Sequence, residues 1–105
     1  MTAENQPSAV ACHLDAASFQ QRTRRFAVLN RESLLESHRL DMSLDLTYSL
    51  SATAELHDLV RLEEECCPFL CFRLQPGETS IKLSITVPES ARDSVNMLLE
   101  PFLGI

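Results

Sequence analysis

The chain has 105 residues, 45% of them hydrophobic and 23% charged, and a formal net charge of −6 at pH 7. A chain of this size folds as one small domain, and its acidic balance argues against direct nucleic-acid binding, which needs clustered cations. No apolar run approaches the ~20 residues that cross a bilayer, and the two glycines of the chain exclude the glycine-rich loops of dinucleotide and P-loop nucleotide folds.

The N-terminal part is predicted to be a leader followed by a helix. Residues 1–13 indicate a flexible leader, and residues 14–105 a single domain. Asp15 is suited to cap a helix that runs from Ala16 to about Asn30. The expected inner face of this helix consists of Phe19, Thr23, Phe26 and Leu29.

Five arginines lie in the N-terminal half of the chain, three of them on this helix. Arg22, Arg24 and Arg25 lie close together, and Arg31 and Arg39 follow them. The pattern favours a solvated helix face. The alternative is a docking surface for an acidic protein partner, centred on Arg22, Arg24 and Arg25. The assembly state of the chain is not predicted.

The next segments have the pattern of β-strands. Leu40–Leu50 carries an apolar residue at every second position, which predicts a strand with one packed and one solvated face. Ser33–Ser37 either extends the first helix or forms a strand of its own. A strand is favoured, because His38–Asp41 can turn between it and the strand that follows.

A second helix is expected after Ser51, which is suited to cap it. The segment Ala52–Cys66 has one apolar face, and Pro68 ends the helix. The apolar face consists of Leu56, Leu59, Val60, Leu62, Cys66 and Cys67. Glu63 falls near the centre of this face, where a carboxylate is unexpected.

The C-terminal part predicts a hairpin and a closing helix. Phe69–Gln75 and Ser80–Val87 are predicted strands, joined by a turn at Gln75–Glu78. Alternation in the first of them places Cys71 on the face away from the core. Pro88 opens the last helix. Its apolar stripe consists of Ala91, Val95, Leu98, Leu99 and Phe102.

These elements predict a two-layer α+β domain, in which helices pack on one face of a three- or four-stranded, antiparallel-rich sheet. If Ser33–Ser37 is a strand, the chain holds two hairpin-plus-helix units in tandem.

Glu63 points to a functional site. A buried carboxylate is costly unless it is protonated, paired or bound to a ligand. Its neighbours three and four positions along the helix are Cys66 and Cys67, so that a carboxylate and two thiols converge. Cys71 is a further candidate ligand, whereas Cys12 lies in the leader.

Plain packing is the alternative for the same group. Free cysteine behaves as a small hydrophobe and often fills a core. Glu63 then reaches water at the rim of the helix face, or accepts a hydrogen bond from Tyr48 or a backbone amide.

The local charges favour metal binding over redox catalysis. Thiols at a helix C-terminus beside Glu64 and Glu65 are expected to have raised pKa values, opposed only by Arg61 and Arg73. A soft metal ion, in contrast, deprotonates its thiol ligands through its own charge. Because the chain has no signal peptide, the expected compartment is the cytoplasm, where thiols stay free.

The segment Leu62–Leu74 resembles the hallmark of a group of small, mostly uncharacterised bacterial proteins. That hallmark is a Glu-x-Glu-Cys-Cys-Pro-Phe core followed by a hairpin and a closing helix. Such proteins are often associated with heavy-metal resistance or mercury-responsive regulators, which implies thiol-dependent binding or sensing of a soft metal. The matching positions are Glu63, Glu65, Cys66, Cys67, Pro68 and Phe69. Cys71 falls at a position expected to vary.

The sequence thus leads to a first hypothesis and two alternatives. The first is a cytoplasmic domain that binds a soft metal ion, or another thiol-reactive ligand, through Cys66 and Cys67 with help from Glu63. The second is a protein-interaction module that docks through its arginine-rich helix and uses its cysteines for packing. The third is a thiol enzyme, with Cys67 as nucleophile and Glu63 as base.

Overall fold

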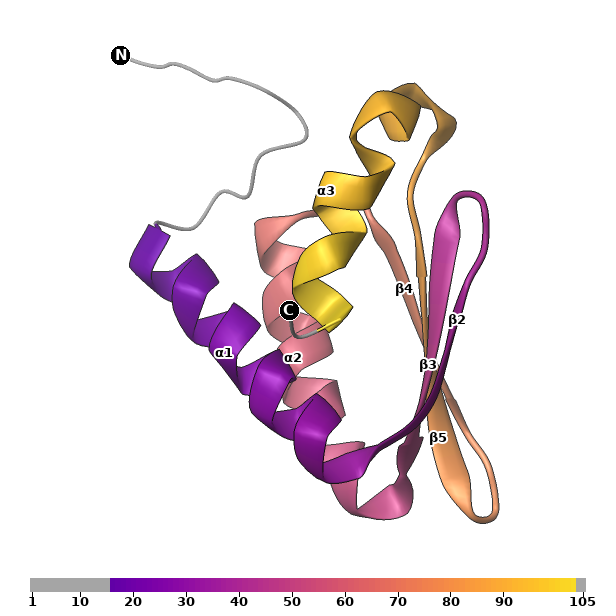
Figure 1. Ribbon diagram of the computed structural model, residues 1–105. Helices are drawn as coiled ribbons and strands as arrows, with labels where there is room; N and C mark the ends of the chain where they lie inside the picture. Colours follow the sequence, from indigo (N-terminus) through magenta and orange to yellow (C-terminus); the bar gives the residue numbers. More distant parts are fainter. Residues whose placement is uncertain (1–15, 104–105) are drawn as a thin grey trace.

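The molecule alternates helices with β-hairpins. The computed structural model describes residues 16–103, with side chains from Phe19 onward (Figure 1). The elements are α1 (Ala16–Ser33), β2 (Leu34–Arg39), β3 (Ser43–Ser49), α2 (Thr53–Cys66), β4 (Cys71–Pro76), β5 (Ser80–Thr86) and α3 (Val95–Leu99). Short 3₁₀ turns at Leu50–Ala52, Glu89–Ser94 and Glu100–Leu103 flank α2 and α3. None of these helices has the length and apolar character needed to cross a membrane.

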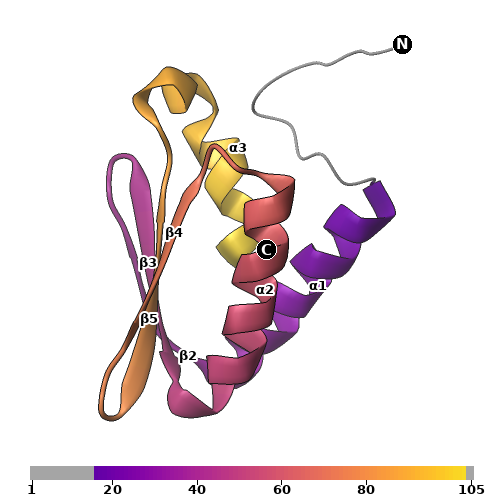
Figure 2. The same cartoon turned by 180° about the vertical axis from the view of Figure 1, so that it is seen from behind.

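The strands form one four-stranded sheet in the order β2-β3-β5-β4, and every neighbouring pair is antiparallel. The helices α1, α2 and α3 all lie on the same face of this sheet (Figures 1 and 2). The predicted two-layer α+β architecture is therefore confirmed. The segment after the first helix is a strand, β2, so the chain does hold two hairpin-plus-helix units, whose inner strands β3 and β5 meet at the centre of the sheet.

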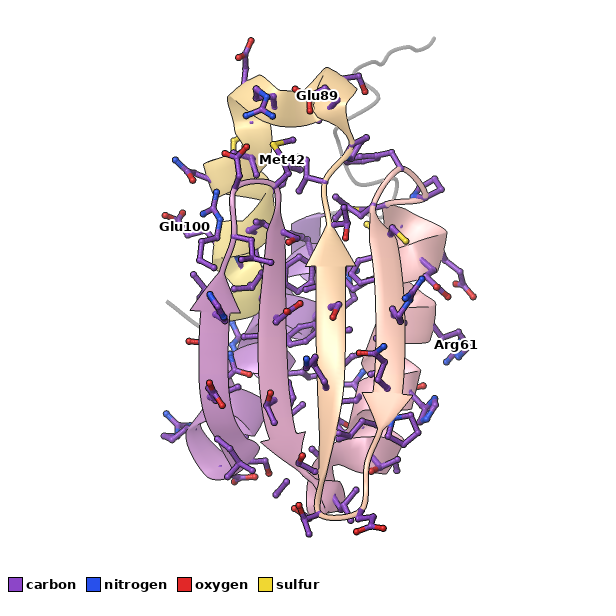
Figure 3. All side chains as sticks on the ribbon, turned by 90° about the vertical axis from the view of Figure 1, so that its right-hand side faces the viewer. Met42, Arg61, Glu89 and Glu100 are labelled. Atoms are coloured by element: carbon purple, nitrogen blue, oxygen red, sulfur yellow. The ribbon has the colours of Figure 1, made fainter. Side chains whose placement is uncertain are left out.

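Alternation along β3 and β5 builds the core beneath the helices. Leu44, Leu46 and Tyr48 of β3 are at most 1% exposed. Their cross-strand partners on β5 are, in the same order, Ile85, Leu83 and Ile81, all fully buried. No described helix covers the opposite face of the sheet, where the side chains between these positions point outward (Figure 3). Met42 and Glu89 lie at the end of the sheet where the chain continues beyond β5 (Figure 3).

The buried face of α1 differs from the predicted one. Arg22, Phe26 and Leu29 are buried, whereas Phe19 is 38% exposed and Thr23 is only half-buried. The N-terminal end of α1 extends beyond the other helices (Figure 1), and Phe19 belongs to this end of the helix. Its ring lies under the guanidinium of Arg22, with Cζ 5.8 Å from the ring centroid. Asp15, the expected cap, lies outside the described residues, as does the predicted leader.

Several element ends also differ from the sequence prediction. Leu40 and Leu50, expected at the two ends of one long strand, are 45% and 42% exposed, because β3 is shorter than its apolar alternation. Ser51 does not cap α2. The N-cap position is Ala52, without a side-chain cap, and Thr53 Oγ1 donates to the Leu50 carbonyl at 2.7 Å.

The closing helix is broken into short pieces. Pro88 precedes a 3₁₀ turn in which Ala91 leaves helical geometry, with φ −110° and ψ 21°, before α3 begins. The predicted apolar stripe nevertheless faces the core: Ala91, Leu99 and Phe102 are buried, and Val95 and Leu98 pack against them.

Candidate metal centre

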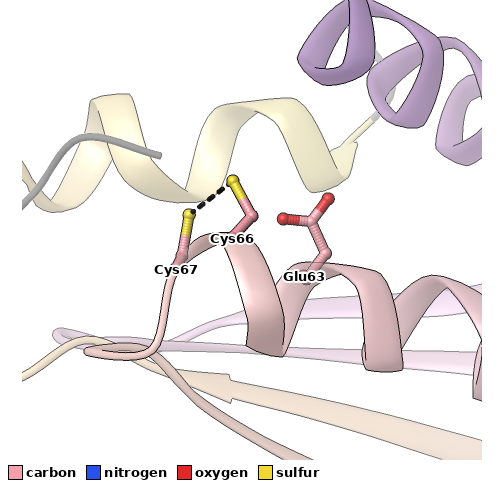
Figure 4. A group of neighbouring side chains, drawn as sticks. All are labelled: Glu63, Cys66 and Cys67. Carbon is pink, nitrogen blue, oxygen red and sulfur yellow. Dashed lines mark hydrogen bonds between the residues drawn. The ribbon is translucent and has the colours of Figure 1, made fainter. Parts of the chain in front are cut away.

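The C-terminal end of α2 brings Glu63, Cys66 and Cys67 together. Their residues are 4%, 0% and 7% exposed, respectively. One carboxylate oxygen and the two sulfurs all lie within 4.8 Å of one another, so the group could hold a metal ion. The convergence expected from helical spacing is confirmed. The side chains project away from the sheet (Figure 4), so the group lies among the helices and not against the strands.

The end of the helix fixes the two cysteines in different backbone states. Cys66 is the last helical residue, and Cys67 has φ −127° and ψ 71°, outside helical geometry. The cause is Pro68, which disfavours helical conformation in the residue before it. The Cys67 amide still donates to the Glu63 carbonyl at 2.7 Å, and its own carbonyl accepts from the Leu70 amide at 3.1 Å. The backbone of Cys67 thus stays hydrogen-bonded to the last turn of α2, and its sulfur lies 3.6 Å from that of Cys66.

Arg22 of α1 completes the group. Its Nε donates to Glu63 Oε2 at 2.8 Å, and its Nη2 donates to the Cys66 sulfur at 3.0 Å. Arg22 is only 3% exposed, so the expectation that it belongs to an exposed docking face is wrong. The sequence did contain a signal for its burial, because Arg22 stands four and seven positions before the buried Phe26 and Leu29.

The other arginines lie elsewhere. Arg25 forms ion pairs with Glu55 and Asp58 of α2, both at 2.9 Å, and Arg24 is exposed. Arg61 pairs with Asp58 at 2.7 Å. The cation that acts on the Cys67 thiol is therefore Arg22, and not Arg61 or Arg73 as the sequence suggested.

Burial controls the acid–base properties of the group. It raises the pKa of Glu63 above the usual value of a glutamate, although the hydrogen bond and charge of Arg22 oppose the shift. Burial also raises the pKa of the Cys67 thiol to about 11, with a further increase from Glu63 and a partial offset from Arg22. The expected rise in thiol pKa is confirmed for Cys67. Such a thiol is a poor nucleophile at neutral pH, which weakens the thiol-enzyme hypothesis.

The redox state of Cys66 differs from the sequence prediction. Its sulfur is disulfide-bonded, whereas Cys67 and Cys71 are free. The expectation of free thiols is therefore wrong for Cys66. Cys67 donates to the Cys66 sulfur across 3.6 Å, so these two neighbours are not joined to each other. Cys66 has to be reduced before it can act as a thiolate ligand.

The remaining predicted ligand and partner residues lie outside this group. Cys71, at the start of β4, is exposed and is not among the three clustered ligand residues. Cys12 lies outside the described residues. His57 is exposed on α2, as expected. Tyr48 donates its hydroxyl to Asn30 Oδ1 and not to Glu63, so the structural hydrogen bond considered for Glu63 comes from Arg22 instead.

Alkylation should distinguish the two free thiols. In the native, unreduced protein, Cys67 is expected to react with iodoacetamide at pH 8 roughly 100-fold more slowly than Cys71, because burial and a high pKa keep it protonated. Timed alkylation followed by peptide mass spectrometry measures both rates. In urea the two rates should become similar, and equal rates without urea would show that Cys67 is accessible.

A comparison of the chain with protein-family models, curated proteins and solved structures finds no match.

Proposed function

We propose that the reduced protein binds a soft, thiophilic metal ion through the thiolates of Cys66 and Cys67, with the Glu63 carboxylate as third ligand. The observation that carries this proposal is the convergence of three buried ligand atoms within 4.8 Å. Two adjacent thiols and a carboxylate together form a donor set that soft ions prefer. The Glu-x-Glu-Cys-Cys-Pro-Phe resemblance, with its association with heavy-metal resistance, supports the same class of ligand.

The spacing of the sulfurs agrees with this role. When two thiolates bind one ion at about 2.3 Å each, a tetrahedral angle separates them by about 3.8 Å. The sulfurs of Cys66 and Cys67 are 3.6 Å apart. A linear arrangement would need about 4.6 Å at the same bond length. The observed separation is therefore close to the tetrahedral value and far from the linear one.

Arg22 would support the ligands without touching the ion. It already donates to Glu63 and to the Cys66 sulfur, which fixes the orientation of both. Hydrogen bonds of this kind hold ligands in place around protein metal sites. The ion itself supplies the positive charge that deprotonates the thiols, including Cys67 with its raised pKa. Binding requires reduction of Cys66, consistent with the cytoplasmic location that the sequence predicts.

Metal titration of the reduced protein tests the proposal. Under anaerobic conditions, Cd²⁺ should bind one ion per chain and produce the ultraviolet charge-transfer absorption of Cd–thiolate bonds. Cys66→Ser and Cys67→Ser should each weaken binding by at least about 100-fold, because each removes a soft ligand. Glu63→Gln should weaken it less, since one oxygen donor is lost.

Cys71→Ser is the matched control and should bind as tightly as the parent protein, because Cys71 is exposed and outside the clustered group. The oxidised protein should not bind at all. Retention of tight binding in both Cys66→Ser and Cys67→Ser would exclude this site and leave the cysteines as packing residues.

A further inference from the structure

Four buried side chains of the metal centre carry or acquire charge in one small space. Glu63 and Arg22 form an ion pair at 2.8 Å, with side chains 6% and 3% exposed. Arg22 also donates to the sulfur of Cys66, and the sulfur of Cys67 lies beside it. Interactions between charges are strong here because little water separates them, and a net charge buried in such a space is costly.

The sum of these charges changes with the ion that is bound. When the two thiols have lost their protons to a metal, Cys66, Cys67 and Glu63 contribute three negative charges and Arg22 contributes one positive charge. A divalent ion brings this sum to zero, whereas a monovalent ion leaves one negative charge in the buried space. The softness of the ligands does not make this distinction, because thiolate sulfur suits soft ions of either charge.

We propose that the net charge of this buried group, set by the two thiolates, Glu63 and Arg22 together, selects the charge of the ion, so that the site prefers divalent soft ions over monovalent ones. This inference rests on the proposed function and adds the class of ion. Arg22 has a double effect in it. Its hydrogen bond and charge favour the ionised form of Glu63 and hold that carboxylate in place as a ligand, and the guanidinium cancels one of the three negative charges.

Cadmium and silver ions test the proposal, because Cd²⁺ and Ag⁺ have the same number of electrons and differ by one charge. Both bind thiolates. Each ion is titrated into the reduced protein in chloride-free buffer, in competition with dithiothreitol. The measured quantity is the preference, defined as the affinity for Cd²⁺ relative to that for Ag⁺, with dithiothreitol as the common reference.

Glu63→Gln removes one negative charge while retaining the size of the side chain and the two thiols. Its preference should shift toward Ag⁺ by at least about tenfold relative to the parent protein. The double variant Arg22→Met/Glu63→Gln removes one charge of each sign, so its preference should return toward Cd²⁺. Charges elsewhere in the chain act equally on a variant and its parent, and the comparison therefore isolates this pair.

A second variant keeps the test decisive if Glu63→Gln does not fold. Cys67→Met also removes one negative charge, retains a sulfur donor and leaves the Glu63–Arg22 pair intact, so its preference should shift toward Ag⁺ as well. An unchanged preference in the folded variants would overturn the charge selection while leaving metal binding in place. Binding of neither ion by the reduced parent protein would instead overturn the proposed function itself.

Discussion

Glu63→Leu is expected to lower the free energy of unfolding of the metal-free protein by about 3–5 kcal/mol, because it leaves the buried Arg22 charged without this carboxylate. The carboxylate and the guanidinium are 2.8 Å apart, and their side chains are 6% and 3% exposed. Arginine does not lose its proton in proteins, so the variant has no chemical way to neutralise the charge. Urea unfolding of the variant and its parent measures the difference.

Arg22→Met should lower the free energy of unfolding by less than Glu63→Leu does. A carboxyl group can take up a proton, and burial already raises the pKa of Glu63. Loss of Arg22 raises that pKa further, because Arg22 is the group that lowers it. A carboxyl group whose pKa is higher in the folded than in the unfolded state binds its proton more tightly when folded. The loss in free energy of unfolding caused by Arg22→Met should therefore become smaller as the pH falls from about 8 to about 5. It should become larger as the pH rises through the pKa of Glu63 in the folded variant.

The double variant Arg22→Met/Glu63→Leu should lie within about 1 kcal/mol of the parent, because it removes both charges of this ion pair together. Arg61→Met is the matched control. Arg61 pairs with Asp58 at 2.7 Å but its side chain is 60% exposed, and surface pairs of this kind contribute at most about 1 kcal/mol. If the effects of the two single changes simply added in the double variant, the ion pair would have no energetic role in the fold.

Leu59→Ala should destabilise the fold by about 2–5 kcal/mol, because it leaves a cavity where α2 packs into the core. Leu59 is fully buried, and α2 is the helix that carries Glu63 and Cys66. Thermal or urea unfolding measures the loss. In the folded variant at low temperature, metal binding should persist, since the ligands themselves are unchanged.

His57→Ala on the same helix is the control for this change. His57 is exposed, so its removal should alter the free energy of unfolding by no more than about 0.5 kcal/mol. Equal effects of Leu59→Ala and His57→Ala would mean that α2 does not present its apolar face to the core as the structure shows.

The fold was largely predictable because its signals are periodic and local. Alternation identified β3 and β5 through residues such as Leu46 and Leu83, both fully buried. Periodicity did not predict where the strand ends, because the apolar alternation continues beyond the residues that pack in the core. Leu40 and Leu50 continue the alternation of β3 but lie outside the strand and are exposed. An apolar side chain shows that a position suits burial, but it does not show where the partner elements end.

The candidate site also has a part that local sequence patterns predicted and a part that they did not. The proximity of Glu63, Cys66 and Cys67 follows from their spacing on a single helix, so helical geometry was enough to predict it. Cys71 follows Pro68 on a strand, where alternation predicted that it faces away from the core, and it is exposed and lies outside the group.

From its sequence alone, this protein could be assigned an α+β architecture and a cluster of one carboxylate and two cysteines, because both depend on contacts between near neighbours in the chain. Only the tertiary structure revealed the partner of Glu63. Arg22 lies 41 positions earlier, and the charges meet because α1 packs against α2 with this arginine facing inward. Pairing over such a separation depends on how two helices pack, which the periodicity of either helix cannot specify.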